Sequence, residues 1–125
     1  MKFRTRRLVL PKDLNSSQKL FGGRLLEWID EECGIHAMLE MKTPRVVTKV
    51  ISQIDFKAPA VRGDVIEIGI DTIRYGRTSI TLRIEVFNRT SGVTMLTIDQ
   101  FVMVSVDEHG QPTPHGVTGP ETEEA

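Results

Sequence analysis

The sequence has little of several features that define whole classes of protein. It has one cysteine, Cys33, so no disulfide can form within the chain, and a lone cysteine is typical of a reducing compartment. No apolar run approaches the ~18 residues that a membrane-spanning helix needs. There are 16 lysine and arginine residues against 17 aspartate and glutamate residues, so no positive excess exists to meet nucleic-acid phosphates. We therefore expect a cytoplasmic protein that binds neither membranes nor nucleic acid.

Metal-binding and targeting patterns are also missing from the sequence. No cluster of histidine, cysteine and acidic residues has the spacing of metal ligands, so we expect no metal. The basic N-terminus precedes only three apolar residues, Leu8 to Leu10, which are too few for a signal peptide. The length suits one domain, which we predict to span residues 1–110. Prolines, glycines and acids predominate in residues 111–125, which we expect to form a flexible tail.

The stretch from Phe21 to Met41 has the pattern of a long amphipathic helix. At 3.6 residues per turn, a mostly apolar stripe falls on one side, formed by Leu25, Leu26, Ile29, Cys33, His36 and Ala37. Glu31 falls toward the opposite side, where we expect it to be solvated, and Asp30 lies at the edge of the stripe. The helix opens with Gly22 and Gly23, and small residues there leave backbone N–H groups accessible. The same pattern also fits an ordinary packing helix.

Alternating apolar residues predict strands on both sides of this helix. The expected strands span residues 3–10, 46–56, 65–74, 79–87 and 93–106. One strand, one helix and four further strands predict an α+β domain in which the helix packs on an antiparallel sheet of about five strands. Simple alternation also makes the second face of the sheet apolar, with Phe87, Met95, Phe101 and Met103 opposite Ile80 and Leu96. An apolar second face usually needs a partner, so we expect an oligomer.

Several blocks of the sequence, in order and at matching spacing, resemble one enzyme family. The blocks are Pro11-x-Asp13-x-Asn15, Leu20-Phe21-Gly22-Gly23 with Trp28-Ile29-Asp30-Glu31, Val46-Val47-Thr48, Ile54-Asp55-Phe56-x-x-Pro59-x-x-x-Gly63-Asp64, Tyr75-Gly76-Arg77-Thr78-Ser79, and Phe101-Val102-x-Val104-x-Val106-Asp107. Over about residues 8–112 the chain resembles the hotdog-fold acyl-CoA thioesterases, which are cytosolic acyl-coenzyme A hydrolases. The resemblance implies a hotdog fold, in which a curved antiparallel sheet wraps one long central helix.

The resemblance also implies an activity and an assembly. Members of the family hydrolyse an acyl-CoA thioester to a free acid and coenzyme A. Coenzyme A is then part of the substrate and product, and no further cofactor is expected. Family members work as dimers or as trimers of dimers, with active sites between subunits. We accordingly expect a homodimer as the active unit, within a tetramer or hexamer.

Site residues carry over from the family position by position. Asp30 matches the catalytic carboxylate, and Asn15 matches the active-site asparagine. The Gly22–Gly23 region matches the backbone amide that binds the thioester carbonyl. Thr48 and the turn Gly76-Arg77-Thr78-Ser79 match segments near the coenzyme A arm, and arginine and hydroxyl groups suit phosphate oxygens.

Thioester hydrolysis needs a polarised carbonyl, an activated water and support for developing negative charge. A free N–H at a helix start can hold the carbonyl oxygen, and the helix dipole favours the charge. Asp30 then acts as a general base or attacks the carbonyl to give an anhydride, and the sequence leaves both open. Gly23 and Asp30 lie ~10.5 Å apart along a helix axis at 1.5 Å per residue, too far for one carbonyl carbon to touch both. We therefore expect a composite site, with Gly23 of one subunit beside Asp30 of the other.

One departure from the family keeps two alternatives open. Gln18 stands where the family usually has glycine, and if that position needs a positive φ, Gln18 is a poor substitute. The first alternative is a hotdog module that binds acyl-CoA without hydrolysing it. The second is a hotdog dehydratase or hydratase, which relies on a histidine with an acid. His36 has no acid at an evident spacing, so we expect it to be packed and hydrogen-bonded, and we expect Cys33 to be a small buried hydrophobe rather than a nucleophile.

Overall fold

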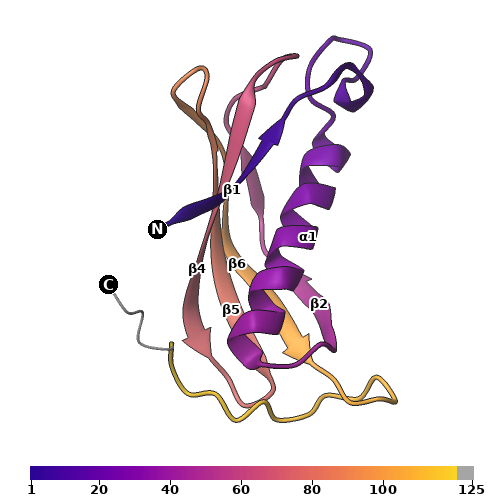
Figure 1. Cartoon of the computed structure of the whole chain (residues 1–125), viewed down its shortest axis with the longest axis vertical. Coiled ribbons are helices and arrows are strands. Elements are labelled where there is room, and N and C mark those ends of the chain that lie inside the picture. Colours follow the sequence, from indigo (N-terminus) through magenta and orange to yellow (C-terminus); the bar gives the residue numbers. More distant parts are fainter. Residues whose placement is uncertain (121–125) are drawn as a thin grey trace.

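The computed structural model describes residues 1–120, which form one long helix and one antiparallel sheet (Figure 1). The elements in chain order are β1 (Phe3–Leu8), the 3₁₀ helix η1 (Pro11–Asp13), α1 (Gly22–Met41), β2 (Val46–Ile51), β3 (Ile54–Phe56), β4 (Val65–Tyr75), β5 (Ser79–Asn88) and β6 (Val93–Ser105). The predicted α+β class is confirmed. None of the helices in residues 1–120 has both the length and the apolar character needed to cross a bilayer.

The strand order places β1 and β2 at opposite edges of the sheet. The order is β1-β4-β5-β6-β2, and the short β3 also pairs with β6, which makes six strands rather than about five. The single strand predicted over residues 46–56 is broken because Ser52 binds the bulged part of β6: its N–H donates to Gln100 O at 2.8 Å, and Gln100 N–H donates to Ser52 Oγ at 3.0 Å. The long helix α1 lies across one face of this sheet (Figure 1).

The helix buries a stripe that differs in part from the predicted one. Its buried side chains are Leu25, Trp28, Ile29, Cys33, Ala37 and Met41. His36 and Leu26, which we placed in the stripe, are only half-buried. Trp28 was missed from the stripe. Arg7 on β1 and Arg24 on α1 itself cover its ring, with their guanidinium carbons 5.7 and 5.6 Å from the ring centroid.

Bulges in β6 overturn the predicted apolar second face. Residues that pair across neighbouring strands share a face, and Ile80 pairs with Met103 while Leu82 pairs with Phe101. Phe101 and Met103 therefore lie in the core beside Ile80, not opposite it. The register shifts because β6 carries an extra residue between Ile98 and Phe101, which reverses the alternation expected for a regular strand. A contact between subunits therefore has to use the apolar side chains that the structure leaves exposed.

The first part of the predicted tail is hydrogen-bonded to the sheet. Thr113 N–H donates to Ser105 O at 2.9 Å, and His115 N–H donates to Arg77 O at 3.3 Å. The expectation of a flexible segment from residue 111 is therefore not met over residues 111–117. The last part of the predicted tail, residues 121–125, lies outside the described residues.

Candidate functional site

Asp30 projects from the middle of α1 toward the edge strand β2. Thr48 on β2 donates a hydrogen bond from Oγ1 to Asp30 Oδ1 at 2.6 Å, and the same hydroxyl lies 3.4 Å from Met103 Sδ. Both Asp30 and Thr48 are exposed, and within residues 1–120 no cation pairs with Asp30. Glu31, expected to be solvated, is half-exposed and accepts a hydrogen bond from Arg7 Nη2 at 3.2 Å. Asp30 is thus an exposed carboxylate that one hydroxyl holds in place.

The helix start presents unused backbone donors, as the paired glycines predicted. Phe21 occupies the N-cap position without a side-chain cap, and the first helical bond runs from Leu25 N–H to Phe21 O at 3.1 Å. The N–H groups of Gly22, Gly23 and Arg24 precede that bond and so have no partner inside the helix. Three backbone donors at this end of α1 are therefore left without a helical partner.

Two exposed aromatic rings flank this helix start. A Cβ at Gly23 would lie 3.0 Å from Phe21 Cε1, and one at Gly22 would lie 3.8 Å from Phe56 Cε1. Phe21 and Phe56 are 56% and 54% exposed, respectively. Glycine at both positions keeps the N–H groups reachable between the rings.

Asn15 lies in the loop that leads into the helix. Its Oδ1 accepts hydrogen bonds from Ser17 N–H at 2.9 Å and Lys19 N–H at 3.1 Å, so the amide oxygen closes the loop. Gln18 has a φ of 62°, which confirms that this position uses the left-handed conformation that favours glycine. Gln18 nevertheless adopts it, and its N–H donates to Asn15 O at 3.1 Å. Only the NH₂ group of Asn15 remains for a substrate.

An ion pair between the buried Asp13 and the partly exposed Arg24, which sequence reasoning missed, fixes the loop to the helix. Asp13 is only 3% exposed and accepts hydrogen bonds from Arg24 Nε at 3.0 Å and from Leu10 N–H at 2.9 Å. Its carbonyl oxygen accepts from Phe21 N–H at 2.9 Å. The pair links residues far apart in sequence, so no periodic pattern indicates it. It sets the position of the helix start.

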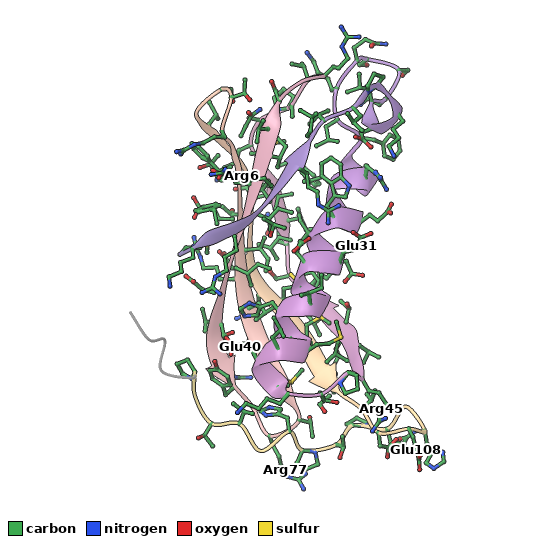
Figure 2. All side chains as sticks on the ribbon, in the orientation of Figure 1. Arg6, Glu31, Glu40, Arg45, Arg77 and Glu108 are labelled. Carbon is green, nitrogen blue, oxygen red and sulfur yellow. The ribbon has the colours of Figure 1, made fainter. Side chains whose placement is uncertain are left out.

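The predicted coenzyme A turn lies far from the helix start within one chain. Gly76 N–H donates to Ser79 O at 2.8 Å and closes the turn, and a Cβ at Gly76 would lie 2.6 Å from Ser79 Oγ, so a side chain there would require the serine hydroxyl to move. Arg77 is exposed at the end of the molecule opposite the first turn of α1 (Figure 2). A helix of 20 residues is about 30 Å long. One chain therefore does not bring Gly23 and Arg77 together.

His36 faces the opposite side of α1 from Asp30. Its Nε2 lies 2.8 Å from Thr72 Oγ1 on β4 and 3.6 Å from Glu40 Oε1. The expected hydrogen bond is confirmed, but the absence of a paired acid was wrong, because Glu40 one helical turn later reaches the imidazole. Since β5 and β6 separate β4 from β2 in the sheet, Asp30 and His36 cannot form one acid–histidine pair. His36 pairs instead with Glu40, and this histidine–acid pair does not include Asp30.

Burial lowers the pKa of His36, while the Glu40 carboxylate acts in the opposite direction. The unfolded chain therefore takes up a proton on His36 near the ordinary value of about 6.5, at a pH where the folded protein does not. We expect the free energy of unfolding to fall as pH falls from 6.5 through the lowered pKa, and to fall less in His36→Gln. Urea unfolding at several pH values measures this, with the exposed His109→Gln as control. Parallel losses in wild type and His36→Gln would contradict the assignment.

Cys33 is buried under α1 and has no catalytic partner. It is fully inaccessible, and burial raises the pKa of its thiol, with the charges of Asp30 and Glu32 adding to the effect. A thiol that stays protonated is a poor nucleophile. The expectation of a small buried hydrophobe is confirmed.

Comparisons with known proteins agree on one family. The sequence model of the thioesterase superfamily matches residues 18–95. An uncharacterised acyl-CoA thioester hydrolase from Buchnera aphidicola is 36% identical over 113 residues, covering 86% of this chain and 83% of the relative. A hexameric thioesterase from Yersinia pestis is 34% identical with a TM-score of 0.79, covering 88% of this chain and 91% of that one.

A further solved relative is an acyl-CoA hydrolase from Staphylococcus aureus, in complex with butyryl coenzyme A and coenzyme A. It is 26% identical with a TM-score of 0.80, covering 95% of this chain and 71% of that one. It was also solved with alanine replacing an aspartate, a threonine and an asparagine. The spacing between that asparagine and aspartate equals the spacing between Asn15 and Asp30. The spacing from that aspartate to the threonine is one residue shorter than the spacing from Asp30 to Thr48.

Proposed function

The chain belongs to the thioesterase superfamily, and we propose that it hydrolyses an acyl-CoA thioester to a free acid and coenzyme A. The observation that carries this proposal is the Asp30 carboxylate, held at 2.6 Å by Thr48 beside the open edge of the sheet. The unused N–H groups of Gly22 and Gly23 supply hydrogen-bond donors for the thioester carbonyl oxygen. Coenzyme A enters and leaves as part of the substrate and product, so the reaction needs no other cofactor.

We propose that two copies associate along β2 to form the active unit. β2 is an edge strand whose outer backbone groups have no partner strand, and its side chains Val47, Val50 and Ile51 are 46%, 46% and 42% exposed. Pairing two such edges around a two-fold axis covers these side chains and sets the two α1 helices antiparallel. The hexameric relatives support a trimer of such dimers over a tetramer.

In this dimer the site combines groups from two subunits. The N–H of Gly23 in one subunit binds the thioester carbonyl oxygen, and the helix dipole stabilises the charge that develops on it. Asp30 of the other subunit removes a proton from the attacking water, or attacks the carbonyl to give an anhydride that water then hydrolyses. In both routes the C–S bond breaks, and coenzyme A leaves as a thiolate that takes up a proton. Thr48 orients that carboxylate through Oδ1. In this proposal the NH₂ group of Asn15 orients the water or the carbonyl.

The antiparallel arrangement also accounts for the distant turn. The end of α1 that carries Gly23 in one subunit faces the opposite end of the other subunit, where Arg77 lies (Figure 2). Gly76, Arg77, Thr78 and Ser79 then meet the coenzyme A arm while the thioester reaches Asp30. Guanidinium and hydroxyl groups are suited to the phosphates of that arm.

Release of free thiol from a panel of acyl-CoAs, short, long and aromatic, tests the proposed function. We expect at least one class to be hydrolysed, and the same panel identifies the preferred acyl group. The competing function is a module that binds acyl-CoA without turnover, which the strained Gln18 favours. No thiol release from any member, together with a raised melting temperature in the presence of acyl-CoA, would establish that alternative instead.

A further inference from the structure

The C-terminal segment of residues 111–117 clamps the backbone of the predicted coenzyme A turn. Three successive carbonyl oxygens of the turn are occupied. Arg77 O accepts from His115 N–H at 3.3 Å, and Thr78 O accepts from Ser105 N–H at 2.7 Å. Ser79 O accepts twice, from Gly76 N–H at 2.8 Å and from His115 Nε2 at 2.9 Å. The turn is therefore fixed both by its own closing bond and by His115.

The contacts of His115 fit one tautomer of its ring. A carbonyl oxygen can only accept, so the bond to Ser79 O places a hydrogen on Nε2. Val117 N–H donates to Nδ1 at 3.0 Å, so Nδ1 has no hydrogen. Both ring nitrogens are used, and the half-buried imidazole joins the segment to the turn. Such complete use of a histidine is typical of a side chain that holds a backbone in one conformation.

The clamp leaves the side chains of the turn available. Arg77 is exposed and makes no ion pair within the described part of the chain, while Thr78 and Ser79 are half-buried. A cation and two hydroxyls on a fixed backbone bind phosphate oxygens better than the same groups on a mobile loop, because less conformational entropy is lost on binding.

We propose that His115 is a positioning residue for coenzyme A: it holds Arg77, Thr78 and Ser79 in the arrangement that meets the phosphates of the arm. The inference rests on the proposed function, in which this turn contacts coenzyme A. It adds that residues 111–117 belong to the substrate site. His115 itself does not touch the reacting thioester.

The test compares two substrates in full-length His115→Ala, His115→Gln and the control His109→Ala. One substrate is an acyl-CoA that the wild type hydrolyses, and the other is the matching acyl-pantetheine, which lacks the nucleotide phosphates. We expect His115→Ala to raise KM for acyl-CoA about tenfold, with kcat unchanged and no change in KM for acyl-pantetheine. The amide NH₂ of glutamine can still donate to Ser79 O, so His115→Gln should recover most of the loss. His109 is exposed on the neighbouring turn, and its variant should match the wild type.

Calorimetric binding of coenzyme A and of pantetheine separates this inference from the activity. If the wild type binds coenzyme A without turnover, the hydrolytic function fails, and a loss of coenzyme A affinity in His115→Ala alone still supports the positioning role. Equal losses for both substrates, a fall in kcat, or no change would overturn it. If His115→Ala does not fold, His115→Gln takes its place. For that variant we expect a smaller rise in KM, which affects acyl-CoA but not acyl-pantetheine. A wild type that neither hydrolyses acyl-CoA nor binds coenzyme A would overturn both proposals.

Discussion

Replacing Asp30 by asparagine is expected to lower kcat by about two to four orders of magnitude. Asparagine has nearly the same shape, and its amide oxygen can still accept the 2.6 Å hydrogen bond from Thr48. It lacks the charge and basicity that a general base or a nucleophile requires, so both mechanisms open to Asp30 are lost. Steady-state thiol release from the acyl-CoA that the wild type prefers measures the effect.

Glu31→Gln is the matched control for this variant. It removes the same charge from the next residue, but Glu31 points toward Arg7 on the other side of α1. We expect its kcat to stay within about twofold of the wild type, since exposed ion pairs contribute little to stability. Comparable losses in both variants would show a general effect of charge on the helix, and full activity in Asp30→Asn would remove Asp30 from the mechanism.

Replacing Gly23 by valine is expected to lower kcat/KM by about two to three orders of magnitude. The added Cβ lies 3.0 Å from Phe21 Cε1, and the two methyl groups would crowd the exposed N–H groups of the first turn. Gly23 has no positive φ, so valine fits the helical backbone and the fold is retained. The readout is kcat/KM from thiol release, with the melting temperature measured in parallel.

Gly34→Ala controls for the loss of a helical glycine. Gly34 lies in the middle of α1, and an added Cβ would meet nothing within 4 Å. We expect wild-type activity together with a stability gain of about 1 kcal/mol, because alanine favours the helix more than glycine does. If Gly34→Ala and Gly23→Val lose activity equally, the effect of Gly23 comes from the helix backbone rather than from a blocked donor.

Local sequence patterns predicted those features that depend on neighbouring residues. The helix bounds followed from periodicity and from Pro44. The family resemblance, rather than a local pattern, raised the question of a positive φ at Gln18, which the structure shows. Features that depend on contacts between distant segments were missed. One missed feature is the bulge after Ile98, which arises from strand pairing. Another is the ion pair of the buried Asp13 with Arg24, which arises from packing. The periodicity of apolar residues along a strand or a helix indicates neither.

The candidate site shows the same division. The family resemblance, not the periodicity, singled out Asp30 and Gly23 as candidates, and the hydrogen bond from Thr48 to Asp30 depends on how β2 returns along the helix. The Glu40 partner of His36 was missed because an apolar stripe does not indicate which polar groups face its edge. The clamp formed by His115 lies in a segment whose composition predicted a loose tail.

Mixing two inactive variants tests the composite site most directly. Asp30→Asn and Gly23→Val subunits are produced together in equal amounts, and the activity of the assembled protein is compared with that of each variant alone. In a mixed dimer one site has an intact Gly23 and an intact Asp30, and the other has neither, so random pairing is expected to restore about a quarter of wild-type activity. Activity no higher than the mean of the two variants would contradict a site shared between subunits.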